Sequence, residues 1–129
     1  MTVSILIVDD EADVAELFRQ RFRREARQGT YVMHFANSGE GALQLLSQGV
    51  EPHLIVILSD INMPGMDGLT LLGEIKQHFP DLPVMMVTAY GDDERRQRAR
   101  DLGAANFLTK PVDFDHLKDQ LAELSRTAG

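Results

Sequence analysis

The 129-residue sequence contains no cysteine, which excludes disulfides, thiolate metal ligands and thiol nucleophiles. No apolar run approaches the ~18 residues that a membrane-spanning helix needs. The N-terminal apolar run lacks a preceding basic region and ends in acids, which is not typical of a secretory signal. Basic residues are also scarce, 13 against 20 acids, and the net charge of −7 argues against direct nucleic-acid or membrane binding. A small acidic protein remains, which we expect to be cytoplasmic and to bind a cation or another protein.

The composition that is present, 43% hydrophobic and 26% charged, is that of an ordinary globular protein. The length suits one compact domain, so we expect residues 1–129 to form a single domain. We find no linker, internal repeat or low-complexity segment.

Short strand-like runs alternate with helical patterns along the whole chain. The expected strands are residues 3–10, 31–36, 53–60, 83–89 and 105–110, and three of them are apolar without polar alternation, as in parallel strands covered on both faces. Helical patterns predict five helices. Apolar residues at helical spacing mark four of them: one stripe contains Val14, Leu17, Phe18 and Phe22, and the others lie near 38–49, 69–79 and 114–124. A polar helix runs through residues 92–102. Ser38 is the expected cap of the second helix and Gly49 its end. Strict alternation predicts an α/β fold, a flavodoxin-like doubly wound parallel sheet of order 2-1-3-4-5 with five helices.

Three acids follow strands that are neighbours in this order. Asp9 and Asp10 end the first strand, and Asp60 ends the third. Each alone could simply cap a helix or shape a turn. Three converging carboxylates repel one another unless a cation intervenes, and a hard divalent ion such as Mg²⁺ suits them. The pattern therefore predicts a Mg²⁺ site at the carboxyl edge of the sheet.

Two further strand ends supply complementary chemistry. Thr88 ends the fourth strand and Lys110 the fifth; taken singly, they read as a helix cap and an exposed lysine. Together with Asp60 and a metal they form a phosphoryl site, in which the carboxylate is the nucleophile and cationic groups stabilise the phosphoryl oxygens.

Four short motifs, "VDDE", "SDINMPGMDG", "TAYG" and "LTKP", lie at these strand ends. With all four in this order, the sequence resembles the receiver domain of two-component response regulators. The resemblance implies that Asp60 accepts a phosphoryl group from a phosphohistidine of a histidine kinase or phosphotransfer protein. It implies that Asp10, Asp60 and the main-chain carbonyl of Asn62 ligate Mg²⁺, with Asp9 acting through water. Lys110 would pair with the phosphoryl group, and the peptide before Pro111 is expected to be cis.

The resemblance also implies a switch. Thr88 would turn its hydroxyl onto the phosphoryl group and Phe107 would turn inward, changing a face that binds an output protein or domain. Tyr90 lies where hydrolytic water must approach, which predicts a long-lived phosphoryl state. The segment before Asp60 is about two residues longer than in similar domains, so its strand could begin later. A phosphorylation-dependent homodimer is left open.

Two other functions compete with this interpretation. An aspartate-nucleophile phosphatase of the haloacid-dehalogenase type uses a similar residue set, but it has a second Asp where this chain has Asn62, and it needs a cap domain. A receiver-like scaffold that works without phosphorylation is the other alternative. We expect self-catalysed phosphotransfer and dephosphorylation without turnover of an external metabolite. Whether the chain acts alone or belongs to a longer protein is open at this stage.

Overall fold

The computed structural model describes residues 2–89 and 91–128, with side chains up to residue 126. Within these residues the chain forms five strands: β1 Val3–Val8, β2 Tyr31–Ala36, β3 Leu54–Asp60, β4 Val84–Thr88 and β5 Asn106–Thr109. The helices are α1 Ala12–Arg21, α2 Arg23–Arg27, α3 Gly39–Gln48, α4 Gly68–His78, α5 Asp93–Asp101 and α6 Phe114–Ala128. All strand pairs are parallel, in the order β2-β1-β3-β4-β5, which confirms the predicted flavodoxin-like sheet.

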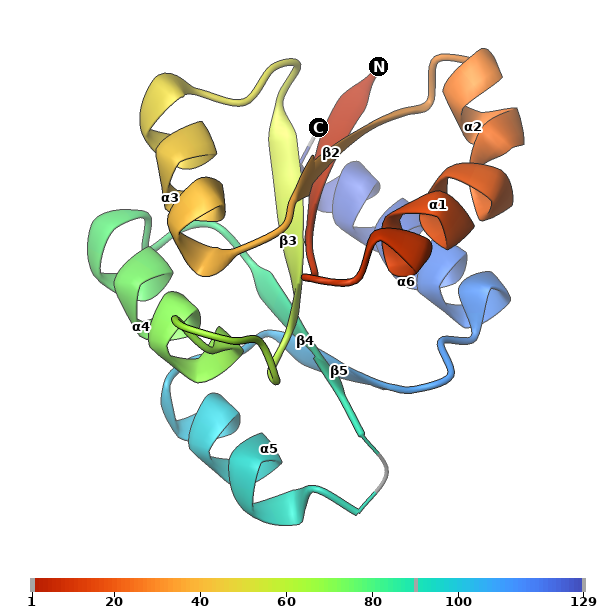
Figure 1. Ribbon diagram of the computed structural model, residues 1–129. Coiled ribbons are helices and arrows are strands. Elements are labelled where there is room, and N and C mark those ends of the chain that lie inside the picture. Colours follow the sequence, from red (N-terminus) through yellow and green to blue (C-terminus); the bar gives the residue numbers. More distant parts are fainter. Residues whose placement is uncertain (1, 90, 129) are drawn as a thin grey trace.

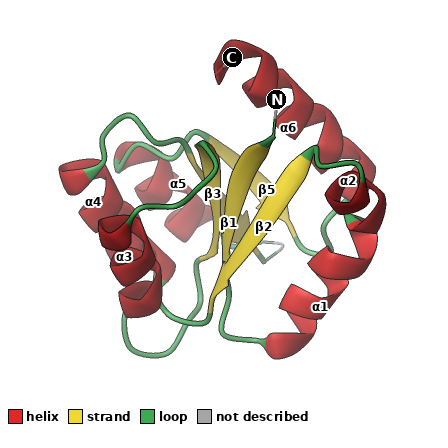
Figure 2. Ribbon diagram, turned by 90° about the horizontal axis from the view of Figure 1, so that it is seen from above, coloured by secondary structure: helices red, strands yellow, loops and turns green. Residues whose placement is uncertain are grey.

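Helices cover both faces of the sheet (Figure 1). Helices α3, α4 and α5 lie on one face and α1, α2 and α6 on the other (Figure 2). Each face has its own buried cluster: Leu6, Val8 and Ile57 point into the first, and Ile5, Ile7 and Leu58 into the second. Every residue of β1 is buried, which explains why the central strands show no polar alternation.

Helix ends agree well with the sequence signals. The Ser38 hydroxyl accepts a hydrogen bond from the Gly41 N–H at 3.0 Å, and Gly49 ends α3 with a φ of +93°. The Asp67 carboxylate accepts from the Thr70 N–H at 2.8 Å, and this bond holds the pKa of Asp67 below its usual value. Asp67 therefore sets where α4 begins.

The first helix differs from the prediction, because it divides into two. Phe22, with φ −105° and ψ 16°, separates α1 from α2, which makes six helices rather than five among the described residues. The bend keeps the Phe22 ring buried, with its centroid 6.0 Å from that of Tyr31. The predicted apolar stripe was wrong at Leu17, which is 40% exposed, because Phe18 and Phe22 form the face that meets the sheet.

An irregularity in the sheet takes up one residue of the extra length before Asp60. Ser4 pairs with Leu54, but the next residue, Ile5, pairs with Val56, so Ile55 is an additional residue in β3. Strand β3 begins at Leu54, one residue later than the start predicted for this strand. From Val56 onward the register is regular, so the bulge leaves the end of β3 in line with the end of β1.

An ion pair ties α2 to α6. The Lys118 ammonium lies 3.0 Å from a Glu25 carboxylate oxygen, and both side chains are largely shielded. The ammonium also lies 5.1 Å from the Phe22 ring centroid. Burial alone would raise the pKa of Glu25, but the hydrogen bond and charge of Lys118 outweigh it, and the pKa is lowered.

This pair predicts a pH-dependent contribution to stability. A carboxyl group whose pKa is lower in the folded state stabilises the fold above its unfolded pKa, and this contribution is lost as the pH falls through the folded pKa. We expect Glu25→Gln to lower the free energy of unfolding by about 1 kcal/mol at neutral pH. The difference between the variant and the wild type should begin to shrink as the pH falls below the ordinary pKa of Glu, about 4.3, and should vanish once the pH is below the lowered pKa of the folded state. Urea unfolding of both proteins at neutral pH and through the acid range measures this difference in the free energy of unfolding.

Glu16→Gln is the matched control for that prediction. Glu16 pairs with Arg19 at 3.6 Å on the exposed face of α1, where an ion pair contributes little. A difference between wild type and Glu25→Gln that stays constant from neutral to acid pH would contradict the proposed linkage.

Candidate functional site

The loop after β1 brings acids to the carboxyl edge of the sheet. The Asp9 N–H donates to the Ala36 carbonyl of β2 at 3.1 Å, which extends the sheet by one residue. The Asp9 carboxylate then accepts a hydrogen bond from the Glu11 N–H at 2.9 Å, which closes a tight turn. This turn brings the Glu11 carboxylate next to that of Asp9, just before α1 begins.

Asp60 is the buried member of the site, with 4% of its surface exposed. Both of its carboxylate oxygens have partners. The Asn62 N–H donates to Oδ1 at 3.3 Å, and the Lys110 ammonium lies 3.0 Å from Oδ2. Lys110 comes from the loop after β5, fifty residues further along the chain. The ion pair therefore joins the end of β3 to the end of β5.

Asp9, Glu11 and Asp60 form one acidic group, with a carboxylate oxygen of each within 4.8 Å of the others. Burial, followed by the charge of Asp60, raises the pKa of Asp9 above its usual value, although the Glu11 N–H opposes this. Burial alone would lower the pKa of Lys110, but the hydrogen bond and charge of Asp60 raise it. Closely spaced carboxylate oxygens are the donors that Mg²⁺ prefers, so the residues present fit a hard divalent cation.

The loop between β3 and α4 is packed closely against Asp60. The Gly68 N–H donates to the Ile61 carbonyl at 2.8 Å. A Cβ atom on Gly68 would stand 2.2 Å from the Asp60 carbonyl oxygen and 2.7 Å from the Ile61 Cα. No side chain fits in that space, so glycine at the first position of α4 lets the helix start directly against the site.

Strands β4 and β5 remain paired up to the site. Asp60 pairs with Val87, and Thr88 pairs with Thr109. The Lys110 N–H donates to the Thr88 carbonyl at 2.9 Å, and the Lys110–Pro111 peptide is cis as predicted. Thr88 is fully buried at the end of β4.

The Thr88 hydroxyl and Phe107 are both in contact with α5. Arg96 of α5 donates from Nη2 to Thr88 Oγ1 at 3.1 Å and to Thr109 Oγ1 at 2.9 Å. Its Cζ lies 5.7 Å from the Phe107 ring centroid, and the Cζ of Arg100 lies 5.5 Å away. Phe107 is half-buried on β5, under these two guanidinium groups.

The structure brings together Asp9, Asp60 and Lys110, but it places Asp10 differently. Asp10 is exposed and is not part of the close acidic group. Its predicted role as a metal ligand, like that of the Asn62 carbonyl, stays a prediction. Tyr90 lies outside the described residues.

Two residues of this region, Glu11 and Arg96, were not predicted from the sequence. Glu11 follows two other acids directly, and it enters the group only because the loop turns at Asp9. Arg96 stands in an arginine-rich helix, where nothing distinguishes it from its exposed neighbours.

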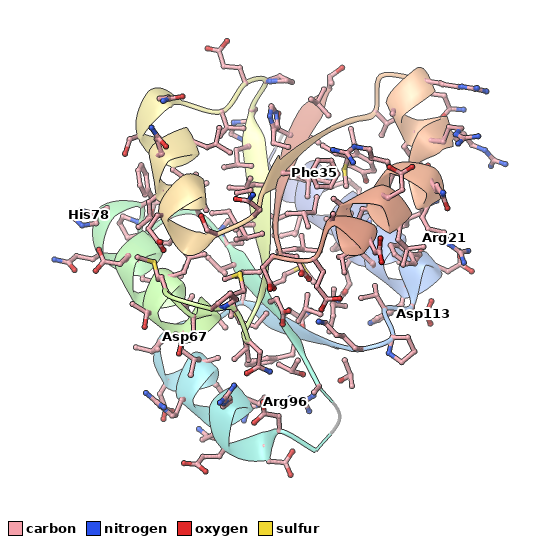
Figure 3. The ribbon with its side chains drawn as sticks, viewed as in Figure 1. Arg21, Phe35, Asp67, His78, Arg96 and Asp113 are labelled. Atoms are coloured by element: carbon pink, nitrogen blue, oxygen red, sulfur yellow. The ribbon has the colours of Figure 1, made fainter. Side chains whose placement is uncertain are left out.

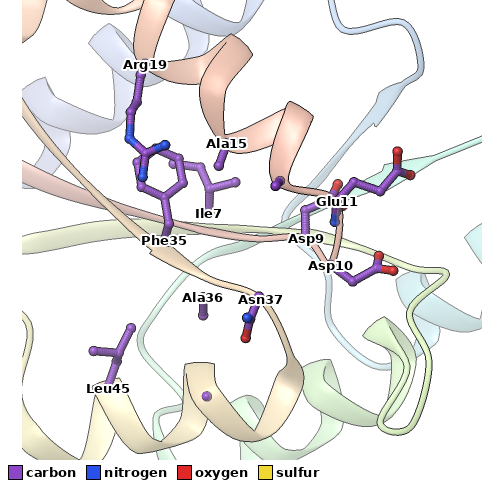
Figure 4. Close-up of a pocket in the computed structure, with 12 residues that line it drawn as sticks. Ile7, Asp9, Asp10, Glu11, Ala15, Arg19, Phe35, Ala36, Asn37 and Leu45 are labelled. Carbon is purple, nitrogen blue, oxygen red and sulfur yellow. Dashed lines mark hydrogen bonds between the residues drawn. The ribbon is translucent and has the colours of Figure 1, made fainter.

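Two hollows flank the loop of Asp9 to Glu11. One, of about 370 Å³, is lined by Asp60, Lys110 and residues of α1 that include the exposed Leu17. The other is about 540 Å³ (Figure 4). In it the acids lie at one end, and Arg19 stacks over Phe35 at the other, with its Cζ 4.4 Å from the ring centroid (Figure 4).

Comparison with known proteins identifies the family. The sequence model described as "Response regulator receiver domain" matches residues 5–122. The regulatory protein AtoC of Escherichia coli (strain K12) is 41% identical over 113 residues, which are 88% of this chain and 23% of AtoC. The receiver domain of NtrX from Brucella abortus superposes with a TM-score of 0.81 at 32% identity, over 95% of this chain and 98% of that one. The response regulator TrrA of Thermotoga maritima, solved in complex with Mg²⁺–BeF, gives 0.78 at 31% identity, over 96% and 99%.

The chain belongs to the response regulator receiver domain family. It spans about a quarter of the length of the curated relatives that it matches. None of the described helices is long and apolar enough to cross a membrane.

Proposed function

We propose that this chain is a phosphorylation-controlled receiver domain, formed by residues 1–129, in which Asp60 accepts a phosphoryl group from a phosphohistidine of a histidine kinase or phosphotransfer protein. The observation that supports this most strongly is the environment of Asp60. It is a buried carboxylate with an ammonium group 3.0 Å away on one side and two further carboxylates on the other. A purely structural ion pair does not need the additional acids, whereas a metal-assisted phosphoryl site does.

The residues present can hold Mg²⁺. Asp60 and Asp10 would ligate it with the main-chain carbonyl of Asn62, and Asp9 would act through a bound water. Glu11 lies close enough to Asp9 and Asp60 to contribute a further oxygen. When bound, the metal supplies positive charge that offsets the carboxylates and the oxygens of the phosphoryl group. Because Asp10 is exposed, its side chain can turn toward the group without leaving a packed position.

In the transfer itself, a carboxylate oxygen of Asp60 forms a bond to phosphorus as the phosphorus–nitrogen bond of the phosphohistidine breaks, and the imidazole regains a proton. Lys110 is already in contact with Asp60, so it can hold a phosphoryl oxygen without a large movement. The Thr88 hydroxyl would then donate a hydrogen bond to another phosphoryl oxygen, and the Phe107 side chain would turn inward.

The switch would act on the face made by α5, β5 and α6. We propose that this face binds an output protein or domain, since the curated relatives are about four times as long as this chain. The named relatives include a regulatory protein and a DNA-binding transcriptional regulator.

Labelling with acetyl phosphate tests the proposal. With Mg²⁺ present, intact-mass spectrometry of the wild type should show one added phosphoryl group that hydroxylamine removes. Asp60→Asn should show none, because an amide is not a nucleophile of this kind. Removal of divalent cations with EDTA should also abolish labelling. A wild type that stays unlabelled with acetyl phosphate and Mg²⁺ would favour the scaffold that works without phosphorylation.

A further inference from the structure

Arg96 connects α5 to the ends of two strands. Figure 3 shows it on α5, on the side toward β4 and β5. One nitrogen, Nη2, donates to both Thr88 Oγ1 and Thr109 Oγ1, at 3.1 and 2.9 Å. These two threonines pair across β4 and β5, so a single guanidinium group spans both strands.

Among the described residues, no carboxylate forms an ion pair with Arg96, although the chain is rich in acids. Its Nε is buried and has no hydrogen-bond partner in the part of the chain that the structure describes. Its neighbour Arg95, by contrast, approaches Asp92, and Arg100 bonds Gln97 on the exposed side of the helix. Within residues 2–89 and 91–128, the hydrogen-bond partners of the Arg96 head group are therefore the two threonine hydroxyls.

We propose that Arg96 is a positioning residue that holds the Thr88 hydroxyl in the unphosphorylated orientation. This inference rests on the proposed function, in which Thr88 must turn toward a phosphoryl group on Asp60. In the structure the Thr88 hydroxyl accepts from Arg96 and lies 3.5 Å from the Leu108 carbonyl, to which it donates. Turning toward the phosphoryl group breaks the bond from Arg96, whereas the bond from Arg96 to Thr109 can remain.

The same side chain links this step to the surface. The Arg96 guanidinium lies over Phe107, so Phe107 cannot turn inward without changing its contact with Arg96. Release of Thr88 and movement of Phe107 therefore both disturb one residue of α5. Arg96 makes the orientation of α5 depend on the orientation of a buried hydroxyl.

Removal of the contact should favour the switched state. Arg96→Met loses the donors but keeps an unbranched side chain over Phe107. With Mg²⁺ and beryllium fluoride as the phosphoryl mimic, we expect the half-saturating beryllium fluoride concentration to fall about 5- to 10-fold, as loss of the one hydrogen bond that differs between the two states, that to Thr88, implies. NMR signals of α5 amides can follow the titration.

Arg100→Met is the matched control. Arg100 lies over the same ring at almost the same distance but makes no bond to Thr88, so its replacement should leave the half-saturating concentration near the wild-type value. In a Thr88→Ala background, Arg96→Met should cause no further change, because the hydroxyl that it holds is gone. If Arg96 only stabilised the fold, Arg96→Met would lower the urea midpoint and leave beryllium fluoride binding unchanged.

A measurement without any phosphoryl mimic separates this inference from the proposed function. Three-bond couplings report the χ1 rotamer of Thr88 in the unmodified protein, and Arg96→Met should change its populations while Arg100→Met does not. If the wild type binds no beryllium fluoride but the rotamer responds to Arg96, the proposed function fails and the positioning role stands. If binding is normal and neither the rotamer nor the half-saturating concentration responds to Arg96→Met, the positioning role is wrong.

Discussion

Gly68→Ala is expected to lower the free energy of unfolding by about 3 kcal/mol, because the new methyl group has no room. Its Cβ would lie 2.2 Å from the Asp60 carbonyl oxygen and 2.7 Å from the Ile61 Cα, and neither backbone atom can turn aside as a flexible side chain could. Relief requires the start of α4 to move away from β3. Urea unfolding at neutral pH measures the loss of stability.

The same substitution should also impair the site. If Asp60 is displaced by about 1 Å, its labelling by acetyl phosphate should slow by on the order of 100-fold. Gly73→Ala is the matched control on the same helix. Its Cβ would meet nothing within 4 Å, so this change should raise stability by about 0.5–1 kcal/mol and leave labelling unaltered. Equal effects of the two substitutions would show that helix propensity, and not contact with Asp60, decides the outcome.

Lys110→Met is expected to slow the labelling of Asp60 by about 100-fold or more, because in the proposed transfer the ammonium group contributes positive charge beside the phosphoryl oxygens. The substitution also leaves Asp9, Glu11 and Asp60 close together without their cation. Added Mg²⁺ should therefore raise the melting temperature of Lys110→Met more than that of the wild type. Intact-mass spectrometry over time and thermal unfolding measure the two effects.

Lys118→Met provides the control. Lys118 also forms a shielded ion pair with a carboxylate, but the pair lies between α2 and α6, away from Asp60. Its loss should lower stability without changing the labelling rate or the response to Mg²⁺. A labelling rate in Lys110→Met equal to that of Lys118→Met would remove Lys110 from the proposed chemistry.

The sheet order could be predicted because the signals that set it are local and repeat along the chain. Apolar runs of strand length alternate with helical spacing, and Ser38 and Gly49 mark where one helix begins and ends. The division at Phe22 could not be predicted in this way. It depends on how the Phe22 ring packs against Tyr31 and how Glu25 meets Lys118, which are contacts between distant parts of the chain.

The site shows the same limit. The proximity of Asp60 and Lys110 follows from strand order alone, because parallel strands end at one edge of the sheet. Glu11 and Arg96 could not be assigned from position. The place of Glu11 depends on a turn made by a single hydrogen bond, and that of Arg96 on which face of a polar helix meets two threonines.

The hydrogen bond from the Lys110 N–H to the Thr88 carbonyl limits which parts of the site can move in the proposed switch. This bond extends the pairing of β4 and β5 one residue beyond the end of β5. These two strands therefore cannot slide or separate near Asp60 without breaking sheet hydrogen bonds. In the proposed switch, the change at Asp60 must therefore reach the surface through rotations of individual side chains rather than through movement of these strands. The helices packed against the sheet are not held by these hydrogen bonds, so they are the parts that can shift in response.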